Sequence, residues 1–490
     1  WQFVSGSVPY SDIIYVRPAI SYLFHSLFFL FDNDYTIIID RVFFYFQVSI
    51  YSYLSILLLL KKFKTENYIY FLSSISFIFS VHTFPPMAWH TVDGIFFCVI
   101  GVFLVLNSNK NLHMFIGGVF LMLGAFCKQP FLLIPLLLIV YFIYNKKFKK
   151  LLISFIGMFS LIFIFFAYLL INDSLTDFLN QVTGQTKFND LLRIGVFQYI
   201  IQWKYILLVL FPPALLTLLF SWSNFKFYFA NYFYILVSWI LIFSLYIYFT
   251  NDTYTEDVFF FGDVLFSISL LIVLVKIYKT KQDSYLILLL FLIISWCSSI
   301  SWGYSTTILF SAPMIFILSL PTHKTINIGS YKKLSLGLLI FGVITFYVGY
   351  QNPYKLYGSS KKSDLVYKMD NIYPKLKFIY GDKQIYSEYL ELKLLISKYE
   401  NKFTVFPAAT LIHFLSGTKN PIGIDWVLNA EVNNQDKEIL YELESNNITV
   451  FVLKRWKPKK GKFGSDLTQF IRDNWHKVEE GKFYDVYKFK

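Results

Sequence analysis

Long apolar runs recur between residues 37 and 350 and constrain the fold more than any other feature. A helix needs roughly 20 predominantly apolar residues to cross about 30 Å of hydrocarbon. We expect helices near residues 37–60, 67–81, 93–106, 113–127, 129–144, 151–171, 203–220, 228–249, 259–279, 284–300, 306–320 and 334–350. With 56% apolar and 21% aromatic residues, the 490-residue chain holds more apolar surface than a soluble domain can bury. The sequence therefore predicts a polytopic all-α membrane protein with about twelve spans in this chain.

The connecting loops differ in charge. Lysine clusters such as KKFK (61–64) and KKFKK (146–150) fall on alternate loops, which the positive-inside rule places in the cytoplasm. The other loops carry mainly Asp and Glu and should face outward, among them a first loop at 1–36 and a second large loop at 172–203. Because loop 1–36 is then outside, we expect one further span ahead of Trp1.

The composition changes after about residue 355 to that of a small α/β domain. Helical spacing is expected at 384–400, 434–445 and 465–475, and strands at 403–406, 447–454 and 483–490. We expect two parts, a transmembrane domain at 1–354 and an α/β domain at 355–490 on the outward, periplasmic side of the cell (inner) membrane. The net charge of +13 comes mainly from loop lysines and the lysine-rich tail, so no nucleic-acid partner is expected.

The first outward loop delivers a carboxylate to the membrane boundary. In SGSVPYSDIIYVRPA, residues 5–19, a turn at Gly6 and Pro9 places Asp12 ahead of an apolar helical run. Burial against lipid-level aromatics raises a carboxyl pKa and nearby cations lower it, a tension typical of functional groups. The same position suits a helix N-cap. The residues alone leave both readings open.

Two further places carry ionisable groups within apolar sequence. His90 and Asp93 lie one helical turn apart in VHTFPPMAWHTVDG (81–94), a spacing that allows a shared ligand or metal. Histidines are also ordinary residents of membrane interfaces. Lys128, in the break GAFCKQPF (124–131), needs an anionic partner such as a carboxylate or phosphate, or else snorkels to the interface.

Other outward charges add to this set, namely Arg17, Arg193 and Glu256. One candidate base and several cations beside lipid suit a substrate with its phosphate at headgroup level and its tail in the bilayer.

The pattern G-x-x-P-Y-x-D from Gly6 to Asp12, followed by Pro18, resembles the first outward loop of the GT-C glycosyltransferases. That group includes the protein O-mannosyltransferases, lipid A aminoarabinose transferase and bacterial family 39-like relatives. The K-Q-P break at Lys128 is similar to a K-G or K-P break in those proteins, and residues 405–421 with the strand after them resemble their outward C-terminal domain. With the expected further span, the chain would have the thirteen spans common in that group.

The resemblance implies inverting transfer of a hexosyl or pentosyl group from a polyprenyl-phosphate carrier to a glycan, lipid or protein acceptor on the outer face of the membrane. Asp12 would be the general base that takes the proton of the acceptor hydroxyl. The implied donor-phosphate ligands are Lys128, Arg17 and Arg193, which would stabilise the leaving phosphate.

The chain departs from some relatives at Ile13, where they have a second acidic residue. That departure leaves Asp93, His90 and Glu256 as candidates for a second acid or for metal ligands. The sequence requires no cofactor, and relatives differ in whether they use a divalent metal.

Two alternatives stay open. A transporter or flippase of lipid-linked sugars would also favour outward cations, but it should place charges at mid-bilayer depth, whereas most charges here lie near helix ends. A glycan polymerase or ligase of similar architecture would use a glycan-bearing lipid instead of a single-sugar donor.

Overall fold

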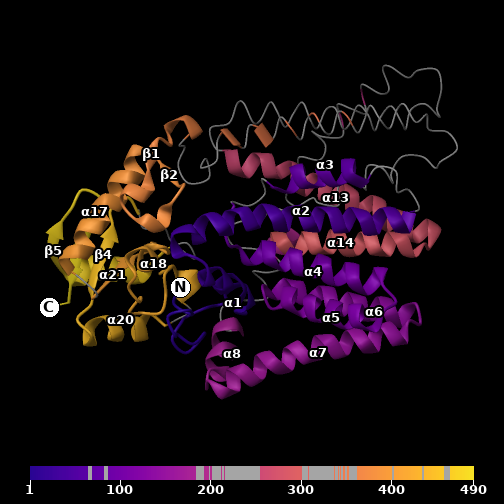
Figure 1. Cartoon of the computed structure of the whole chain (residues 1–490), viewed down its shortest axis with the longest axis horizontal. Coiled ribbons are helices and arrows are strands. Elements are labelled where there is room, and N and C mark those ends of the chain that lie inside the picture. The colour runs from indigo at the N-terminus through magenta and orange to yellow at the C-terminus, as the bar shows by residue number, and fades with distance from the viewer. Residues whose placement is uncertain are drawn as a thin grey trace. The chain divides into compact units, whose positions relative to one another are not determined.

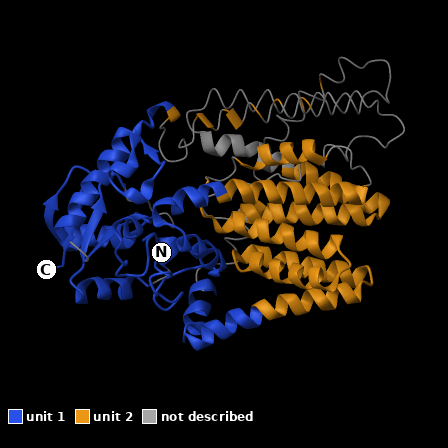
Figure 2. Cartoon of the chain, viewed as in Figure 1, with its two compact units in different colours: residues 1–42, 162–186, 363–490 blue, residues 43–161, 187–362 orange. Residues whose placement is uncertain are grey.

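The computed structural model describes residues 1–63, 69–81, 86–183, 193–197, 199–200, 254–300, 361–399, 402–432, 435–456 and 464–489, with single positions between 211 and 351. Contacts divide the chain into two compact units (Figure 2). Unit 1 comprises residues 1–42, 162–186 and 363–490, and unit 2 comprises residues 43–161 and 187–362. The boundary near residue 355 stays a prediction, and unit 1 takes in the first loop besides the C-terminal region.

Helices account for nearly all the described part of unit 2 (Figure 1). They are α2 (Thr36–Phe63, which begins in unit 1), α3 (Ile69–Val81), α4 (His90–Asn107), α5 (Asn111–Ala125), η4 (Gln129–Leu132), α6 (Leu133–Tyr144), α7 (Phe148–Ile171, which ends in unit 1), η5 (Arg193–Phe197), α13 (Tyr254–Thr280) and α14 (Asp283–Ser299). The eight predicted helices in this part of the chain are confirmed. Those predicted at 203–220, 228–249, 306–320 and 334–350 lie almost wholly outside the described residues.

Three described helical segments are long and apolar enough to cross a bilayer by length and composition: Asn33–Phe63, His90–Asn107 and Phe148–Ile171. Shorter apolar helices are also present, at Ile20–Leu30, Ile69–Ile78, Asn111–Ala125, Gln129–Tyr144 and Asp283–Ser299. Helices α4 and α5 form a close hairpin, because a Cβ on Gly101 would lie only 2.8 Å from the Gly117 carbonyl oxygen. The helical class is therefore confirmed, while the span count and the sidedness stay predictions.

Unit 1 contains a four-stranded sheet in the order β3-β4-β6-β5. Its strands are β3 (Phe403–Phe406), β4 (Thr449–Leu453), β5 (His476–Glu480) and β6 (Tyr484–Lys488). β3 and β4 are parallel, and the other pairs are antiparallel. β4 is buried along its whole length, as a central strand covered on both faces must be. A small antiparallel pair, β1 (Tyr367–Lys368) and β2 (Tyr380–Gly381), lies apart from this sheet.

Alternate residues of β4 enter two different apolar clusters. Val450 and Val452 belong to one cluster, and Phe451 and Leu453 belong to the other. The helices of this region are α17 (Lys383–Tyr399), α18 (Ile412–Ser416), α19 (Asn429–Val432), α20 (Asp436–Ser445) and α21 (Asp466–Asn474). The predicted α/β character and all six predicted C-terminal elements are confirmed.

The N-terminal loop of unit 1 packs on this sheet region. It leads into α1 (Ile20–Ser26), η1 (Leu27–Leu30) and η2 (Asn33–Tyr35), and α8 (Leu175–Thr183) also belongs to unit 1. Trp1 and Phe29 pack against the Phe451 cluster, and Ile14 packs against the Val450 cluster. The loop that carries Asp12 is thus built onto a folded core.

Candidate functional site

Asp12 closes a tight turn in the first loop of unit 1. Its carboxylate Oδ2 accepts a hydrogen bond from the backbone N–H of Val8 at 2.8 Å, and its own N–H donates to the Val8 carbonyl at 3.0 Å. The side chain is exposed, and within the described residues no donor bonds its other oxygen, Oδ1. Helix α1 begins at Ile20 with Ala19 as its N-cap, so the N-cap alternative for Asp12 is wrong. The carboxylate stabilises its own turn and leaves one oxygen open to solvent.

Tyr10 gives the turn its shape. Its backbone φ is 72°, a left-handed conformation that costs a residue with a side chain roughly 1–3 kcal/mol. The ring offsets this cost because it is almost fully buried, packs edge-on to Phe178 at 5.0 Å between centroids, and donates its hydroxyl proton to the Arg17 carbonyl. Burial raises the pKa of this phenol, which keeps it a hydrogen-bond donor.

Gln181 on α8 clamps the same turn from another part of the chain. Its amide nitrogen donates to the Tyr10 carbonyl at 2.7 Å, and its amide oxygen accepts from the Tyr15 N–H at 2.8 Å. Gln181 is only 1% exposed, so both backbone groups are satisfied without water.

Gly423 contacts Asp12 through its backbone. A Cβ at this position would lie 2.1 Å from the Asp12 carbonyl oxygen, and the φ of +63° also favours glycine. The Gly423 carbonyl accepts a hydrogen bond from the Ile14 N–H at 3.1 Å.

Arg17 forms an ion pair within unit 1. Its guanidinium donates two hydrogen bonds to Glu431, at 2.7 and 3.0 Å, in the bidentate arrangement that suits a carboxylate. Burial alone would lower the pKa of Arg17, but Glu431 outweighs burial and raises it. The guanidinium therefore already has an anionic partner in the protein, and its predicted role toward a phosphate stays a prediction.

Unit 2 holds a different group of charges, inside its helices. Asp93 lies in the first turn of α4, is fully buried and accepts a hydrogen bond from the Gln47 amide at 2.7 Å. Lys128 lies between α5 and η4 and is 4% exposed. Both residues lie at one end of the α4–α5 hairpin, because a Cβ on Gly124 would lie 2.9 Å from the Gly94 carbonyl oxygen.

Lys128 caps the C-terminus of α14. Its Nζ donates to the Ser298 carbonyl at 3.1 Å and lies 3.5 Å from the Cys297 carbonyl. These carbonyls belong to the last turn of a helix, where they have no intrahelical partner and where the helix dipole favours a cation. The side chain is therefore held by the protein, so the snorkelling alternative is wrong.

The segment that carries Arg193 also docks on the end of α14. The Gly195 carbonyl accepts a hydrogen bond from Trp296 at 2.7 Å, and the Tyr199 hydroxyl donates to Ser299 at 2.7 Å. Arg193 itself is exposed at the start of η5. The segments that carry Lys128 and Arg193, two of the three predicted phosphate ligands, thus both contact the last turn of α14.

Two further predicted site residues are His90 and Glu256. His90 opens α4, where its ring stacks on Trp89 at 5.7 Å, and Glu256 lies in α13 with its side chain outside the described part. Within the described residues, no three His, Cys, Asp or Glu side chains gather in a way that could hold a metal ion.

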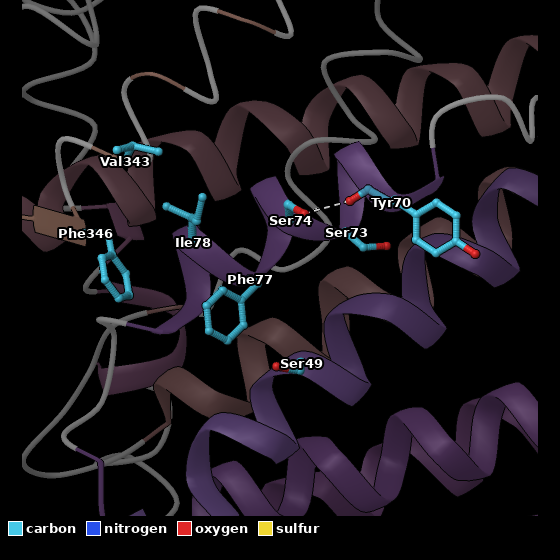
Figure 3. Close-up of a pocket in the computed structure, with 8 residues that line it drawn as sticks. All are labelled: Ser49, Tyr70, Ser73, Ser74, Phe77, Ile78, Val343 and Phe346. Atoms are coloured by element: carbon cyan, nitrogen blue, oxygen red, sulfur yellow. Dashed lines mark hydrogen bonds between the residues drawn. The ribbon is translucent and has the colours of Figure 1, made fainter. Parts of the chain in front are cut away.

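A groove of about 510 Å³ in unit 2 is apolar in character (Figure 3). Its lining residues are Ser49, Tyr70, Ser73, Ser74, Phe77, Ile78, Val343 and Phe346. Ser49 and Ser74 donate their hydroxyl protons to carbonyls of their own helices, which removes polarity from the groove. Among the described residues that line the groove, the only ionisable group is a tyrosine, so this lining does not suit a phosphate.

Comparisons with known proteins give no relative. No family model matches the chain, and no curated protein or solved structure matches it.

Sequence reasoning missed the distant residues that hold the first loop of unit 1. Gln181, Gly423 and Glu431 lie at least 160 positions along the chain from the residues of the first loop that they contact. Gly423 alone carried a local signal, as a glycine within the turn-rich stretch SGTKNPIG (416–423).

Proposed function

We propose that the chain is an integral-membrane inverting glycosyltransferase. It moves a sugar from a polyprenyl-phosphate carrier to an acceptor hydroxyl on a glycan, lipid or protein at the outer face of the membrane. The observation that supports the proposal is the exposed carboxylate of Asp12. One of its oxygens accepts a hydrogen bond within its own turn, and the other is available to a substrate.

In the proposed reaction, Asp12 accepts the proton of the acceptor hydroxyl as that oxygen attacks the anomeric carbon of the sugar. The bond between this carbon and the phosphate oxygen breaks, and polyprenyl phosphate leaves with the bonding electrons. A phosphate is a good leaving group, so the step needs a base and cations but no general acid. A turn anchored by Gln181 and Gly423 favours this role, because a base must be held at a fixed distance from its substrate.

Lys128 is the cation proposed for the donor phosphate. It is buried at the end of a helix, where an additional anion would be attracted in a medium of low dielectric constant. This role is independent of the role of Asp12 and can be tested by itself.

The proposal is tested by comparing lipid-linked sugars and glycans, by mass spectrometry, in cells that carry the wild type, Asp12→Asn or Asp32→Asn. Asp32 is a matched control because it too is exposed and accepts from a nearby backbone N–H, that of Asp34, at 3.0 Å. Asparagine can keep the bond to Val8 but cannot act as a base. We expect Asp12→Asn to lose the glycosylated product and accumulate the donor, and Asp32→Asn to resemble the wild type.

Normal product in cells with well-expressed Asp12→Asn would contradict the proposal. Movement of a labelled carrier lipid across a liposome membrane, with no glycosidic bond made or broken, would favour the flippase instead.

A further inference from the structure

The turn at residues 420–425 is built around one buried side chain. The Asn420 amide nitrogen donates to the Ile424 carbonyl at 2.7 Å and to the Asp425 carboxylate at 2.8 Å, and its oxygen accepts from the Ile422 N–H at 3.3 Å. Asn420 is 3% exposed, so these bonds are shielded from water. One side chain thus fixes the backbone on both sides of Gly423.

The same turn is anchored to the sheet core. Ile422, Ile424 and Val427 are buried in the cluster that contains Val450 and Val452. The Val427 N–H also donates to the Pro407 carbonyl at 2.8 Å, just beyond the end of β3. Movement of the turn would disturb the core, which makes it a rigid support.

Asp12 rests directly on this support. The backbone of Gly423 lies so close to Asp12 that no side chain fits between them. A Cβ on residue 423 would lie 2.1 Å from the Asp12 carbonyl oxygen, inside van der Waals contact. The Ile14 N–H bonds the Gly423 carbonyl, so the chain is held on both sides of Ile13. Displacing a reacting group by about 1 Å can cost roughly 10²-fold in rate.

We propose that Asn420 and Gly423 are positioning residues for Asp12, and that the C-terminal sheet region thereby sets the rate of sugar transfer. This inference rests on the proposed function. It gives the region 363–490 a direct part in the reaction through the backbone of the Asp12 turn.

Gly423→Ala tests the proposal, with Gly417→Ala as a matched control. Both glycines have positive φ, +63° and +75°, so alanine is strained at both. At Gly417, however, the nearest atom to a new Cβ is the Lys375 ammonium nitrogen at 3.9 Å, which is ordinary contact. The difference between the two variants therefore isolates the collision with Asp12.

Two readouts are needed, both on the full chain in lipid nanodiscs. Hydrogen exchange at the Ile14 amide should become faster in Gly423→Ala and stay unchanged in Gly417→Ala. In a transfer assay with a polyprenyl-phosphate sugar, Gly423→Ala should lower kcat about 10²-fold with little change in the donor KM. In an Asp12→Asn background, Gly423→Ala should lower kcat no further, because the positioned group is already gone.

Asn420→Ala serves if Gly423→Ala does not fold, since it removes the amide that fixes residues 422–425 and adds no charge beside Asp425. We then expect a smaller loss of kcat, on the order of 10-fold. Unchanged exchange at Ile14 in Gly423→Ala, or an equal fall of kcat in both glycine variants, overturns the proposal. If the wild type transfers no sugar, the proposed function fails, while the exchange measurement still decides whether Gly423 holds the turn.

Discussion

The two units hold their charged candidates in opposite ways. In unit 1, Asp12 is exposed, and its turn is held by the side-chain amide of Gln181 and by the backbone of Gly423. In unit 2, Asp93 and Lys128 are buried, with an amide and helix carbonyls as partners. An exposed carboxylate can exchange a proton with a substrate, whereas a buried charge is costly and must be stabilised where it lies. The first arrangement suits a base, and the second suits a fixed electrostatic site.

Among the variants that leave Asp12 in place, Lys128→Met has the largest expected effect, and it tests whether the buried lysine of unit 2 is an electrostatic site. Loss of a cation that stabilises a leaving phosphate should lower kcat/KM for the donor by about 10²–10³-fold. The measurement is transfer from a polyprenyl-phosphate sugar by the purified protein.

Lys150→Met is the matched control. Lys150 also caps the C-terminus of an apolar helix, because its Nζ donates to the Ser108 carbonyl at 2.7 Å and lies 3.4 Å from the Val105 carbonyl. Equal losses in the two lysine variants would reduce Lys128 to a helix cap.

Gln181→Ala tests whether the Asp12 turn depends on α8. It leaves the Tyr10 carbonyl and the Tyr15 N–H buried without their partner, at a cost of about 1–3 kcal/mol each in the free energy of unfolding. Chemical unfolding measures the cost, and Thr176→Ala, a change at an exposed residue of the same helix, should stay within about 0.5 kcal/mol of wild type. A Gln181 variant as stable as the wild type would show that the clamp is dispensable.

A double-mutant cycle on Arg17 and Glu431 tests whether Arg17 is a structural ion-pair partner or a ligand of the donor phosphate. If the ion pair is structural, Arg17→Met and Glu431→Met should be non-additive in the free energy of unfolding, with a coupling of about 0.5–3 kcal/mol. The donor KM distinguishes the second possibility. If Arg17→Met raises the donor KM and Glu431→Met lowers it, the guanidinium is a phosphate ligand for which Glu431 competes.

The smallest expected effect is a pH dependence of the C-terminal region. Burial raises the pKa of Asp425 to about 6 from 3.8, against hydrogen bonds from Asn420 and Gln2, which lower it. The folded chain then keeps a proton that the unfolded chain has lost, so this group lowers stability as pH rises from about 4 to 6. Burial lowers the pKa of His413 to about 4 from 6.5, so that group lowers stability as pH falls through the same window.

The pH dependences that Asp425 and His413 contribute have opposite signs. Asp425→Asn removes the first and leaves the contribution of His413. The free energy of unfolding of this variant should rise more steeply with pH between about 4.5 and 6 than that of the wild type, by up to about 1.4 kcal/mol per pH unit. Urea unfolding of the full chain across this range measures the slope. An unchanged slope would mean that Asp425 does not titrate there.

The pattern of apolar residues in the sequence predicted many of the helices and strands. The long apolar runs predicted the described helices of unit 2. Short runs rich in Val, Phe, Tyr and Thr predicted β3, β4 and β6, because these strands are largely buried. β5 was missed since HKVEE is an edge strand with almost no buried residue, and such a strand shows no apolar alternation. Among the described residues, the backbone pairing with β6 defines this strand.

The candidate site was predictable only in its local part. A turn with Gly6 and Pro9 placed Asp12 in a loop, but nothing near it in the sequence specifies Gln181 or Gly423, since these contacts form only in the folded chain. The N-cap reading failed for a related reason. The carboxylate binds a backbone N–H four residues before it, and the helix begins eight residues after it.

The most direct test of the account is the release of polyprenyl phosphate by purified wild type, Asp12→Asn and Asp32→Asn in lipid nanodiscs, with donor and acceptor supplied. Asp12→Asn should lower kcat about 10²–10⁴-fold with an unchanged thermal midpoint, and Asp32→Asn should leave kcat at the wild-type value. Release by folded Asp12→Asn at the wild-type rate would show that Asp12 is not the base.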